Sequence, residues 1–179
     1  GTTLKSINNK IPNSEITIID TPGLIPDGRI SDLISVESGL KLVPAGEISR
    51  KTFKLEENQV FMFDVFCRFK ILGNELLKSG SKPIFSAYAS KSVKFHVARE
   101  ERVEALLSGS FFEILEGSEK EKYFQNEFVT YEVEIEENEE LVIAGLGWIN
   151  VKRGPLKIQL EVPEKVKVII RPSIFRNKK

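Results

Sequence analysis

The residues with the clearest chemical meaning stand at the end of a short β-branched run. Ile16 to Ile19 predicts a buried strand, and Asp20-Thr21-Pro22-Gly23 follows it directly. A carboxylate at a strand end can hold a water of a Mg²⁺ shell, and a nearby glycine lets its N–H approach a terminal phosphate. This pattern is typical of a nucleotide switch, although the same four residues also form a good plain turn.

A second element lies ahead of Asp20, where Gly1-Thr2-Thr3 opens the sequence. A switch threonine supplies a hydroxyl to Mg²⁺ and a backbone N–H to the γ-phosphate. Two such elements at this spacing favour a nucleotide switch over a turn that happens to follow an ordinary pair of threonines.

The net charge of zero is the sum of unlike segments. Residues 1–112 carry 15 Lys and Arg against 13 Asp and Glu, residues 113–140 carry 2 against 11, and residues 141–179 carry 9 against 2, so the segments contribute +2, −9 and +7. The basic last segment is a candidate for phosphate contacts, and the alternative is that its cations merely solvate the outer faces of strands. The candidates are Lys152, Arg153, Lys157, Lys165, Lys167 and Arg171.

The elements that must position the first motif occupy residues 1–44. Beyond the strand and turn, the apolar spacing predicts a helix from Ser31 to Val43, capped by Ser31 or Ser35. Pro44-Ala45-Gly46 breaks that helix, and we predict a domain boundary there.

Residues 45–179 are predicted to be rich in β-strands. A long strand is expected over 60–72, a helix over 98–107 ended by Gly109, and a polar surface excursion over 113–127. Gly145-Leu146-Gly147 indicates a bulge or a close approach of two backbones. We identify no internal repeat in the sequence.

Three single residues have ordinary structural explanations. His96 is expected to be a plain strand histidine, because no second histidine or nearby cysteine completes a metal site. Cys67, the one cysteine, is expected to be a buried apolar side chain. Because a single cysteine cannot form a disulfide within the sequence, a cytoplasmic compartment is favoured. For Trp148, both a core position and stacking on a base remain open. No apolar run approaches the roughly 20 residues of a membrane span.

Three motifs together resemble the YqeH family of circularly permuted GTPases, which are associated with assembly of the small ribosomal subunit. They are Gly1-Thr2-Thr3, Asp20-Thr21-Pro22-Gly23-Leu24 and Gly145-Leu146-Gly147-Trp148-Ile149. The resemblance implies that Thr3 binds Mg²⁺, that Asp20 holds Mg²⁺ through water, and that the Gly23 N–H binds the γ-phosphate. It also implies that Leu24 replaces a water-orienting glutamine, with a potassium ion or a backbone group assisting hydrolysis.

The same resemblance implies an α+β architecture, in which the end of a permuted P-loop α/β domain (residues 1–44) precedes a β-rich C-terminal domain (45–179). The sequence contains no G-x-x-x-x-G-K-[ST], Asn-Lys-x-Asp or zinc-binding CxxC pair, and in the permuted order these would lie upstream of Gly1. Because the P-loop supplies most of the binding energy for a triphosphate, these residues alone are expected to be inactive.

The function expected of the intact protein is therefore GTP hydrolysis with Mg²⁺, and with K⁺ as a candidate second ion, in small-subunit biogenesis. Its expected partners are GTP and ribosomal RNA or the small subunit, with no membrane. The expected nucleotide-binding residues are Thr2, Thr3, Asp20, Thr21, Pro22 and Gly23. The alternative is a non-catalytic module that binds RNA or protein and keeps only vestigial switch motifs.

Overall fold

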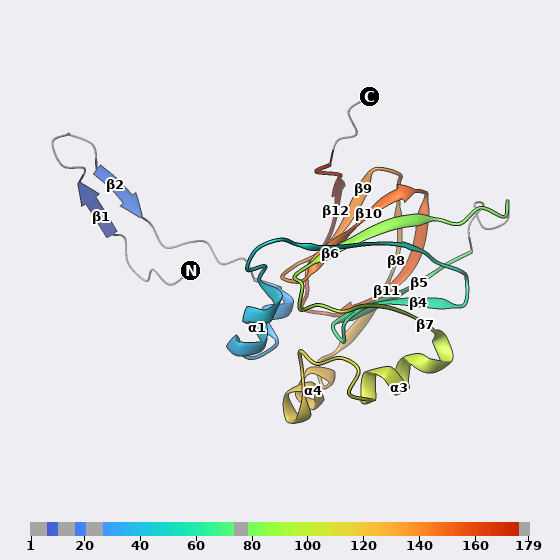
Figure 1. The fold of residues 1–179 in the computed structure, drawn as a ribbon, viewed down its shortest axis with the longest axis horizontal. Coiled ribbons are helices and arrows are strands. Elements are labelled where there is room, and N and C mark those ends of the chain that lie inside the picture. The colour runs from blue at the N-terminus through green and yellow to red at the C-terminus, as the bar shows by residue number, and fades with distance from the viewer. Residues whose placement is uncertain (1–6, 11–16, 21–26, 74–78, 176–179) are drawn as a thin grey trace.

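The computed structural model describes residues 7–10, 17–20, 27–73 and 79–175. Its main body is a sandwich of two five-stranded antiparallel sheets, with short helices at one end (Figure 1). We call them sheet 1, with the strand order β12-β9-β10-β6-β3, and sheet 2, with the order β7-β4-β5-β11-β8. The β-rich character predicted for the second part of the chain is confirmed. A permuted P-loop domain stays a prediction.

Each sheet contains strands from both halves of the chain. Sheet 1 contains β3 (Ser49–Lys54), β6 (Ile84–Ala89), β9 (Glu139–Ile143), β10 (Gly147–Arg153) and β12 (Val168–Pro172). Sheet 2 contains β4 (Gln59–Phe63), β5 (Cys67–Ile71), β7 (Phe95–Arg99), β8 (Phe128–Ile135) and β11 (Leu156–Pro163). The helical elements are η1 (Ile30–Asp32), α1 (Val36–Leu42), η2 (Glu100–Arg102), α3 (Val103–Ser108) and α4 (Gly117–Phe124).

A separate two-stranded hairpin contains the strand predicted before the switch motif. Strand β1 (Ile7–Lys10) pairs antiparallel with β2 (Thr17–Asp20), so that Ile7 lies opposite Asp20. Asp20 is thus the last residue of a strand, as the sequence predicts.

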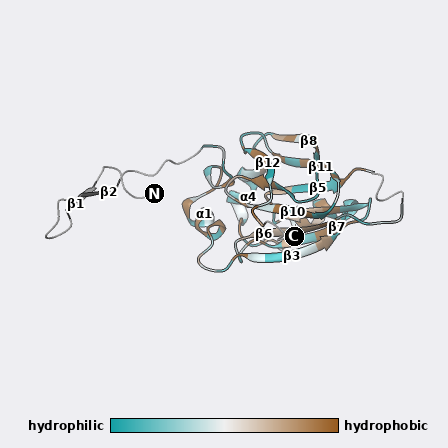
Figure 2. Ribbon diagram, turned by 90° about the horizontal axis from the view of Figure 1, so that it is seen from above, coloured by the Kyte–Doolittle hydropathy of each residue, from teal (hydrophilic) through white to brown (hydrophobic). Residues whose placement is uncertain are grey.

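The core between the two sheets is built largely from phenylalanine rings. Phe61 of sheet 2 lies 4.9 Å from Phe53 and 5.2 Å from Phe85, both of sheet 1, measured between ring centroids. Along β5 and β11 the inward side chains are apolar and the outward ones are mostly polar, and strands in Figure 2 carry both colours. Cys67 is buried in this core, as predicted.

The two sheets are related by an internal duplication that the sequence analysis does not detect. The strands β3 to β7 correspond in order to β8 to β12. When each strand of sheet 2 is replaced by its counterpart, the result is the strand order of sheet 1. The register follows the same rule, because the pair Arg68–Glu161 in sheet 2 corresponds to the pair Trp148–Tyr88 in sheet 1. The prediction of no internal repeat is therefore wrong.

The local hydrogen bonds repeat as well. In the first half, the Asp64 N–H donates to the carbonyl of Lys94 (2.8 Å). In the second half, the Ala144 N–H donates to the carbonyl of Lys167 (3.0 Å). The segments 55–71 and 135–151 differ by one constant number of residues along the chain. The segments that start at Val93 and at Val166 differ by a slightly smaller number.

The single strand predicted over 60–72 is in fact two strands joined by a tight turn. Asp64 has a positive φ of 52°, and its carboxylate accepts N–H bonds from Val65 (3.0 Å) and Lys94 (3.0 Å). Asp tolerates this left-handed conformation better than most residues, because its short polar side chain bonds to nearby backbone. An apolar alternation that continues through the turn hides the break in the sequence.

The buried Asp64 carboxyl predicts a measurable pH dependence of stability. Burial raises its pKa from 3.8 to about 6, against the opposing effect of the N–H bonds from Lys94 and Val65. The folded chain therefore holds this proton more tightly than the unfolded chain. The contribution of Asp64 to stability is full below about pH 4 and falls by up to about 3 kcal/mol as the pH rises through about 6.

Urea denaturation of the chain and of Asp64→Asn between pH 4 and pH 7 measures this effect. As the pH rises, the unfolding free energy of the wild type should fall relative to that of Asp64→Asn. A difference that stays constant, or that moves the other way, would show that the carboxyl is already ionised at acidic pH.

The helices of the structure differ in part from those expected. The Ser35 hydroxyl accepts the N–H of Ser38 (3.2 Å) and so caps α1, as predicted. Gly109 ends α3, also as predicted. The polar excursion expected over 113–127 instead contains α4, in which the buried Tyr123 donates its hydroxyl to the carbonyl of Phe66 (2.7 Å).

The segment before the predicted domain boundary packs on the sandwich. Ile30 is fully buried, and its N–H donates to the carbonyl of Ala144 (2.9 Å). The Ser90 hydroxyl donates to the carbonyl of Lys41 (2.8 Å). The boundary predicted at residue 44 therefore does not coincide with a break in packing. The assignment of residues 1–44 to a GTPase domain stays a prediction.

Candidate nucleic-acid interface

The outer face of sheet 1 carries an aromatic stack, in which Tyr88 is buried, Trp148 is half-buried and Phe175 is exposed. Tyr88 of β6 and Trp148 of β10 lie opposite each other in the register, with ring centroids 4.9 Å apart and planes only 5° from parallel. Phe175 stacks on the Tyr88 ring at 5.2 Å, and the Arg50 guanidinium lies 5.8 Å from the centre of that ring. Trp148 therefore lies outside the core between the sheets, with its ring on the outer surface.

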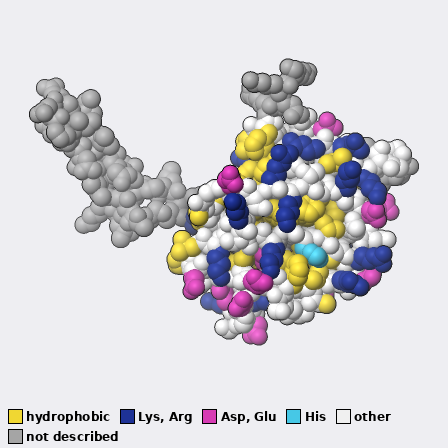
Figure 3. Space-filling view, in the orientation of Figure 1, with side chains coloured by type: hydrophobic (Ala, Val, Ile, Leu, Met, Phe, Trp, Pro, Cys, Tyr) yellow, Lys and Arg dark blue, Asp and Glu magenta, His cyan; other side chains and the backbone are white. Residues whose placement is uncertain are grey.

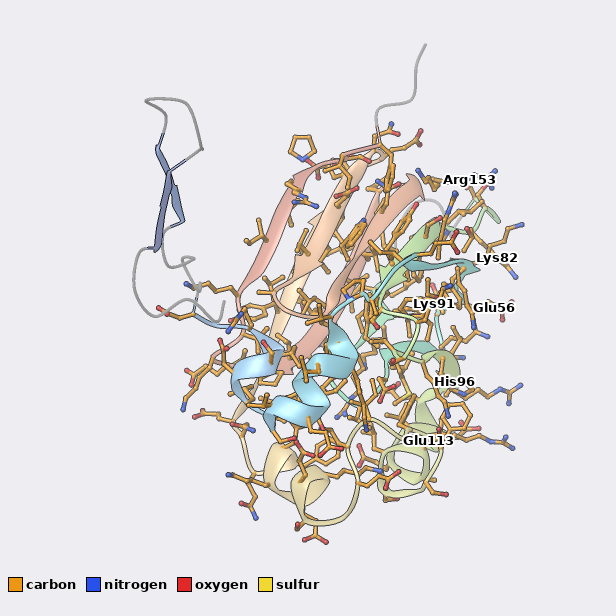
Figure 4. All side chains as sticks on the ribbon, turned by 60° about the vertical axis from the view of Figure 1, so that its left-hand side comes forward. Glu56, Lys82, Lys91, His96, Glu113 and Arg153 are labelled. Atoms are coloured by element: carbon orange, nitrogen blue, oxygen red, sulfur yellow. The ribbon has the colours of Figure 1, made fainter. Side chains whose placement is uncertain are left out.

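The cations of this face gather on the strands next to the stack. Arg50 and Lys54 point outward from β3, and Lys54 and Arg153 both lie opposite Ile84. Neighbouring strands lie about 4.8 Å apart, so Lys54 and Arg153 stand roughly 10 Å from each other. Figure 4 shows Arg153 at the end of the sandwich away from His96 and Glu113. None of these three cations forms an ion pair with a carboxylate in the described part of the chain.

Polar side chains fill the next row of the same face. Glu140 is fully buried, and its carboxylate is paired with the Arg171 guanidinium at 3.1 Å. Asn150 is also fully buried and donates its amide N–H to the Ser173 hydroxyl (2.6 Å). Two atoms here have no hydrogen-bond partner among the described residues, namely the Trp148 Nε1–H and the Asn150 Oδ1.

Glycines allow the strands of this face to approach closely. A Cβ on Gly147 would collide with the carbonyl oxygen of Tyr88, and Gly145 has a positive φ of 74°. A side chain at Gly147 would push β10 away from β6, and one at Gly145 would collide with Arg29. The close backbone approach predicted from Gly145-Leu146-Gly147 is thus confirmed.

The corresponding face of sheet 2 has the opposite chemistry. At the positions equivalent to Arg50, Thr52 and Lys54, strand β8 carries Thr130, Glu132 and Glu134. Arg68 stands at the Trp148 position and is paired with Glu161, at the Tyr88 position, at 2.7 Å. On the side of the molecule shown in Figure 3, several acidic side chains also gather over the helices at the lower end. Sheet 2 thus places carboxylates on β8 where sheet 1 places cations on β3, and its outer face also carries Arg68, Lys70 and Lys157.

The predicted nucleotide residues fall largely outside the described residues. This holds for Thr2, Thr3, Thr21, Pro22 and Gly23, while Asp20 is placed only as the end of β2. Across 27–73 and 79–175, no group of three His, Cys, Asp or Glu residues is arranged to hold a metal ion.

The six predicted phosphate-binding cations do not form one cluster. Lys152 and Arg153 end β10 of sheet 1, whereas Lys157 points outward from sheet 2 opposite Glu134. Lys165 and Lys167 alternate in the sequence as residues on one face of a strand do, but they lie in the connection before β12. Arg171 neutralises Glu140.

Tyr88 carries no signal in the sequence as a member of this surface, and Arg50 and Lys54 indicate a basic surface less strongly than the cations of the last segment. The strands of these three residues meet β10 only in the folded sheet, through pairings between residues far apart in the chain. The sequence therefore singles out Arg153 and Trp148 but does not join them to Arg50, Lys54 and Tyr88. His96 lies in β7 as expected, with its ring 4.7 Å from that of Phe111.

Comparison with known proteins gives the family. The model of the YqeH-like C-terminal family matches residues 82–174, just over half of the 179 residues. The chain belongs to this YqeH-like C-terminal family. It is also 26% identical over 177 residues to the uncharacterized protein YqeH of Bacillus subtilis strain 168. That alignment covers 98% of this chain and 46% of the relative, so the chain spans about half of the relative's length.

The YqeH-like match includes most of the candidate interface. Tyr88, Trp148 and Arg153 lie within it, whereas Arg50 and Lys54 of β3 precede it. No helix in the described part of this YqeH-like chain is long and apolar enough to cross a membrane.

Proposed function

We propose that this chain is the C-terminal part of a GTP-hydrolysing protein, and that its β-sandwich binds RNA on the outer face of sheet 1. The RNA proposed is that of the small ribosomal subunit, and the place proposed is the cytoplasm. Family membership and the switch-like motifs at both ends of residues 1–23 support the GTPase part.

One observation supports RNA binding above the others. Arg50, Lys54 and Arg153 lie on one sheet face without a carboxylate partner in the described residues, beside an aromatic stack on the outer face. Cations already held by carboxylates contribute little to phosphate binding, since their charge is offset, whereas free cations release counterions from the nucleic acid. On the equivalent face of sheet 2 the strand β8 carries Glu132 and Glu134, and Arg68 and Lys70 are paired with carboxylates, so free cations distinguish sheet 1.

The proposed GTPase activity gives roles to three residues within 1–23. Thr3 and Asp20 would hold Mg²⁺, and the Gly23 N–H would contact the γ-phosphate. Bound Mg²⁺ would neutralise charge that develops on the transferred phosphoryl group. The P-loop would come from a segment preceding Gly1. Titration of the full-length protein with GTP tests this part, and unchanged affinity after Asp20→Ala would count against it.

The RNA proposal predicts a change in salt dependence. Binding of a labelled RNA stem-loop should weaken steeply with salt, with a slope of about −0.7 to −0.9 for each phosphate contact. The triple variant Arg50→Gln, Lys54→Gln and Arg153→Gln should lose up to three contacts and flatten the slope by about 2. Fluorescence anisotropy at several salt concentrations measures both slopes.

The matched control removes a cation from the other sheet. Lys70 of β5 is paired with Glu100 at 2.9 Å, so Lys70→Gln should leave the slope unchanged. Absence of RNA binding, or an equal effect of the control, would contradict the proposal. The first of these outcomes would favour a protein partner for the sandwich.

A further inference from the structure

Resting on the proposed RNA function, we propose that the outer face of sheet 1 takes single-stranded RNA. One unpaired base of that strand enters the aromatic stack and occupies the place on the Tyr88 ring that Phe175 holds in the structure. The cations Arg50, Lys54 and Arg153 then contact the phosphates on either side of the base.

The internal duplication shows that the fold does not require this stack. The two sheets have the same strand order and register, yet sheet 2 places an Arg68–Glu161 ion pair where sheet 1 places Trp148 and Tyr88. An ion pair therefore satisfies the architecture at these positions. Rings at the surface beside free cations are instead the combination that binds single strands, because every base presents a π-face and a charged backbone follows it.

Phe175 is bound to the stack in a way that permits its displacement. Its ring is 44% exposed, and its backbone N–H and carbonyl bond only to the Ser173 hydroxyl among the described residues (3.1 and 3.3 Å). Ser173 itself is fixed to the sandwich, through its N–H to the carbonyl of Asn138 (2.8 Å) and through Asn150. Phe175 can therefore leave Tyr88 while the chain up to Ser173 stays in place.

Two buried polar atoms of β10 support a ligand on this face. The Trp148 Nε1–H is a donor and the Asn150 Oδ1 is an acceptor, and both lack a partner among the described residues. They come from residues two apart on one strand, so both side chains lie on the outer face. The edge of a nucleobase offers acceptors and donors to such a pair, whereas the phenylalanine ring offers neither.

Trp148 provides the readout, because it is the protein's one tryptophan. We expect a single-stranded oligouridylate of about twelve nucleotides, within the usual site size, to quench its emission on binding. A blunt RNA duplex of the same length should bind more weakly and leave the emission unchanged, because its bases are already stacked. Equal affinity for both RNAs without quenching would overturn the inference but leave the proposed function standing.

Variants test the stack and the displacement separately. Tyr88→Leu should weaken oligouridylate binding at least about fivefold, the lower bound for the loss of one stacked base. Phe175→Ala should tighten binding, because it removes the ring that competes with the base. A weaker or unchanged affinity for Phe175→Ala would overturn the displacement.

The control is Glu161→Leu, which changes the position of sheet 2 equivalent to Tyr88 and should not weaken binding of the oligouridylate. Circular dichroism of each variant shows whether it is folded, and quenching of the unmodified protein does not depend on any variant. If neither RNA binds at any salt concentration, the proposed RNA function fails, and this inference fails with it.

Discussion

Replacing Phe61 with alanine should destabilise the sandwich by about 3–5 kcal/mol, the usual cost of removing a buried phenylalanine ring. Phe61 is fully buried, and its ring contacts other rings from both sheets. These rings belong to Phe53, Phe63, Phe69, Phe85 and Phe95. Because close packing leaves few neighbours free to refill the space, most of the cavity should persist. Urea denaturation followed by circular dichroism measures the loss.

Phe111 offers a matched control for the same substitution. Its side chain is 41% exposed, and it packs beside His96 and Phe112 outside the space between the sheets. Phe111→Ala should cost less than about 1 kcal/mol, in the range of surface changes. Comparable losses for the two variants would mean that the two sheets are not held together mainly by the Phe61 cluster.

Local features of the fold were predictable from the sequence because they depend on adjacent residues. Ser35 caps α1 and Gly109 ends α3 through bonds to their own helices. The close approach at Gly147 follows from its missing side chain. In each case the residue type decides the outcome within a few positions of the chain.

The features that were missed depend on contacts between distant residues or on one unusual backbone angle. The turn at Asp64 interrupts an apolar alternation that continues through it, so periodicity alone favours one strand. Helix α4 is polar on most of its surface, and its place is fixed by Tyr123, which inserts beside Phe66. Neither the turn at Asp64 nor the burial of Tyr123 produces a hydrophobic pattern in its own segment.

The internal duplication did leave a trace in the sequence. Leu55-Glu56-Glu57-Asn58 and Ile135-Glu136-Glu137-Asn138 each precede a pair of short strands at the same spacing. Three identical residues are too few to establish a repeat by themselves. The shared register of the two sheets gives them meaning, and with it the contrast between the aromatic face and the acidic one.

The comparison of the two sheets also predicts how stability responds to substitutions in the buried ion pair of sheet 1. Glu140 is fully buried, and Arg171 holds its carboxylate through Nε and Nη2, both at 3.1 Å. Arg171→Ala should destabilise the chain by about 3 kcal/mol, because it leaves a buried charge without its counterion. This is the low end of the range for buried pairs, since the Arg171 side chain is 41% exposed and water can reach the vacated site.

The duplicated half specifies the change that should restore stability. At the positions equivalent to Glu140 and Arg171, sheet 2 pairs Val60 with Ala98. Adding Glu140→Val to Arg171→Ala removes the stranded charge, and apolar replacements of buried pairs are often neutral or stabilising. Chemical denaturation should therefore find the double variant more stable than Arg171→Ala and within about 1 kcal/mol of the parent chain. If the second change lowered stability further, the Glu140 bonds to Asn150, Ser173 and Ile174 would be worth more than the charge costs.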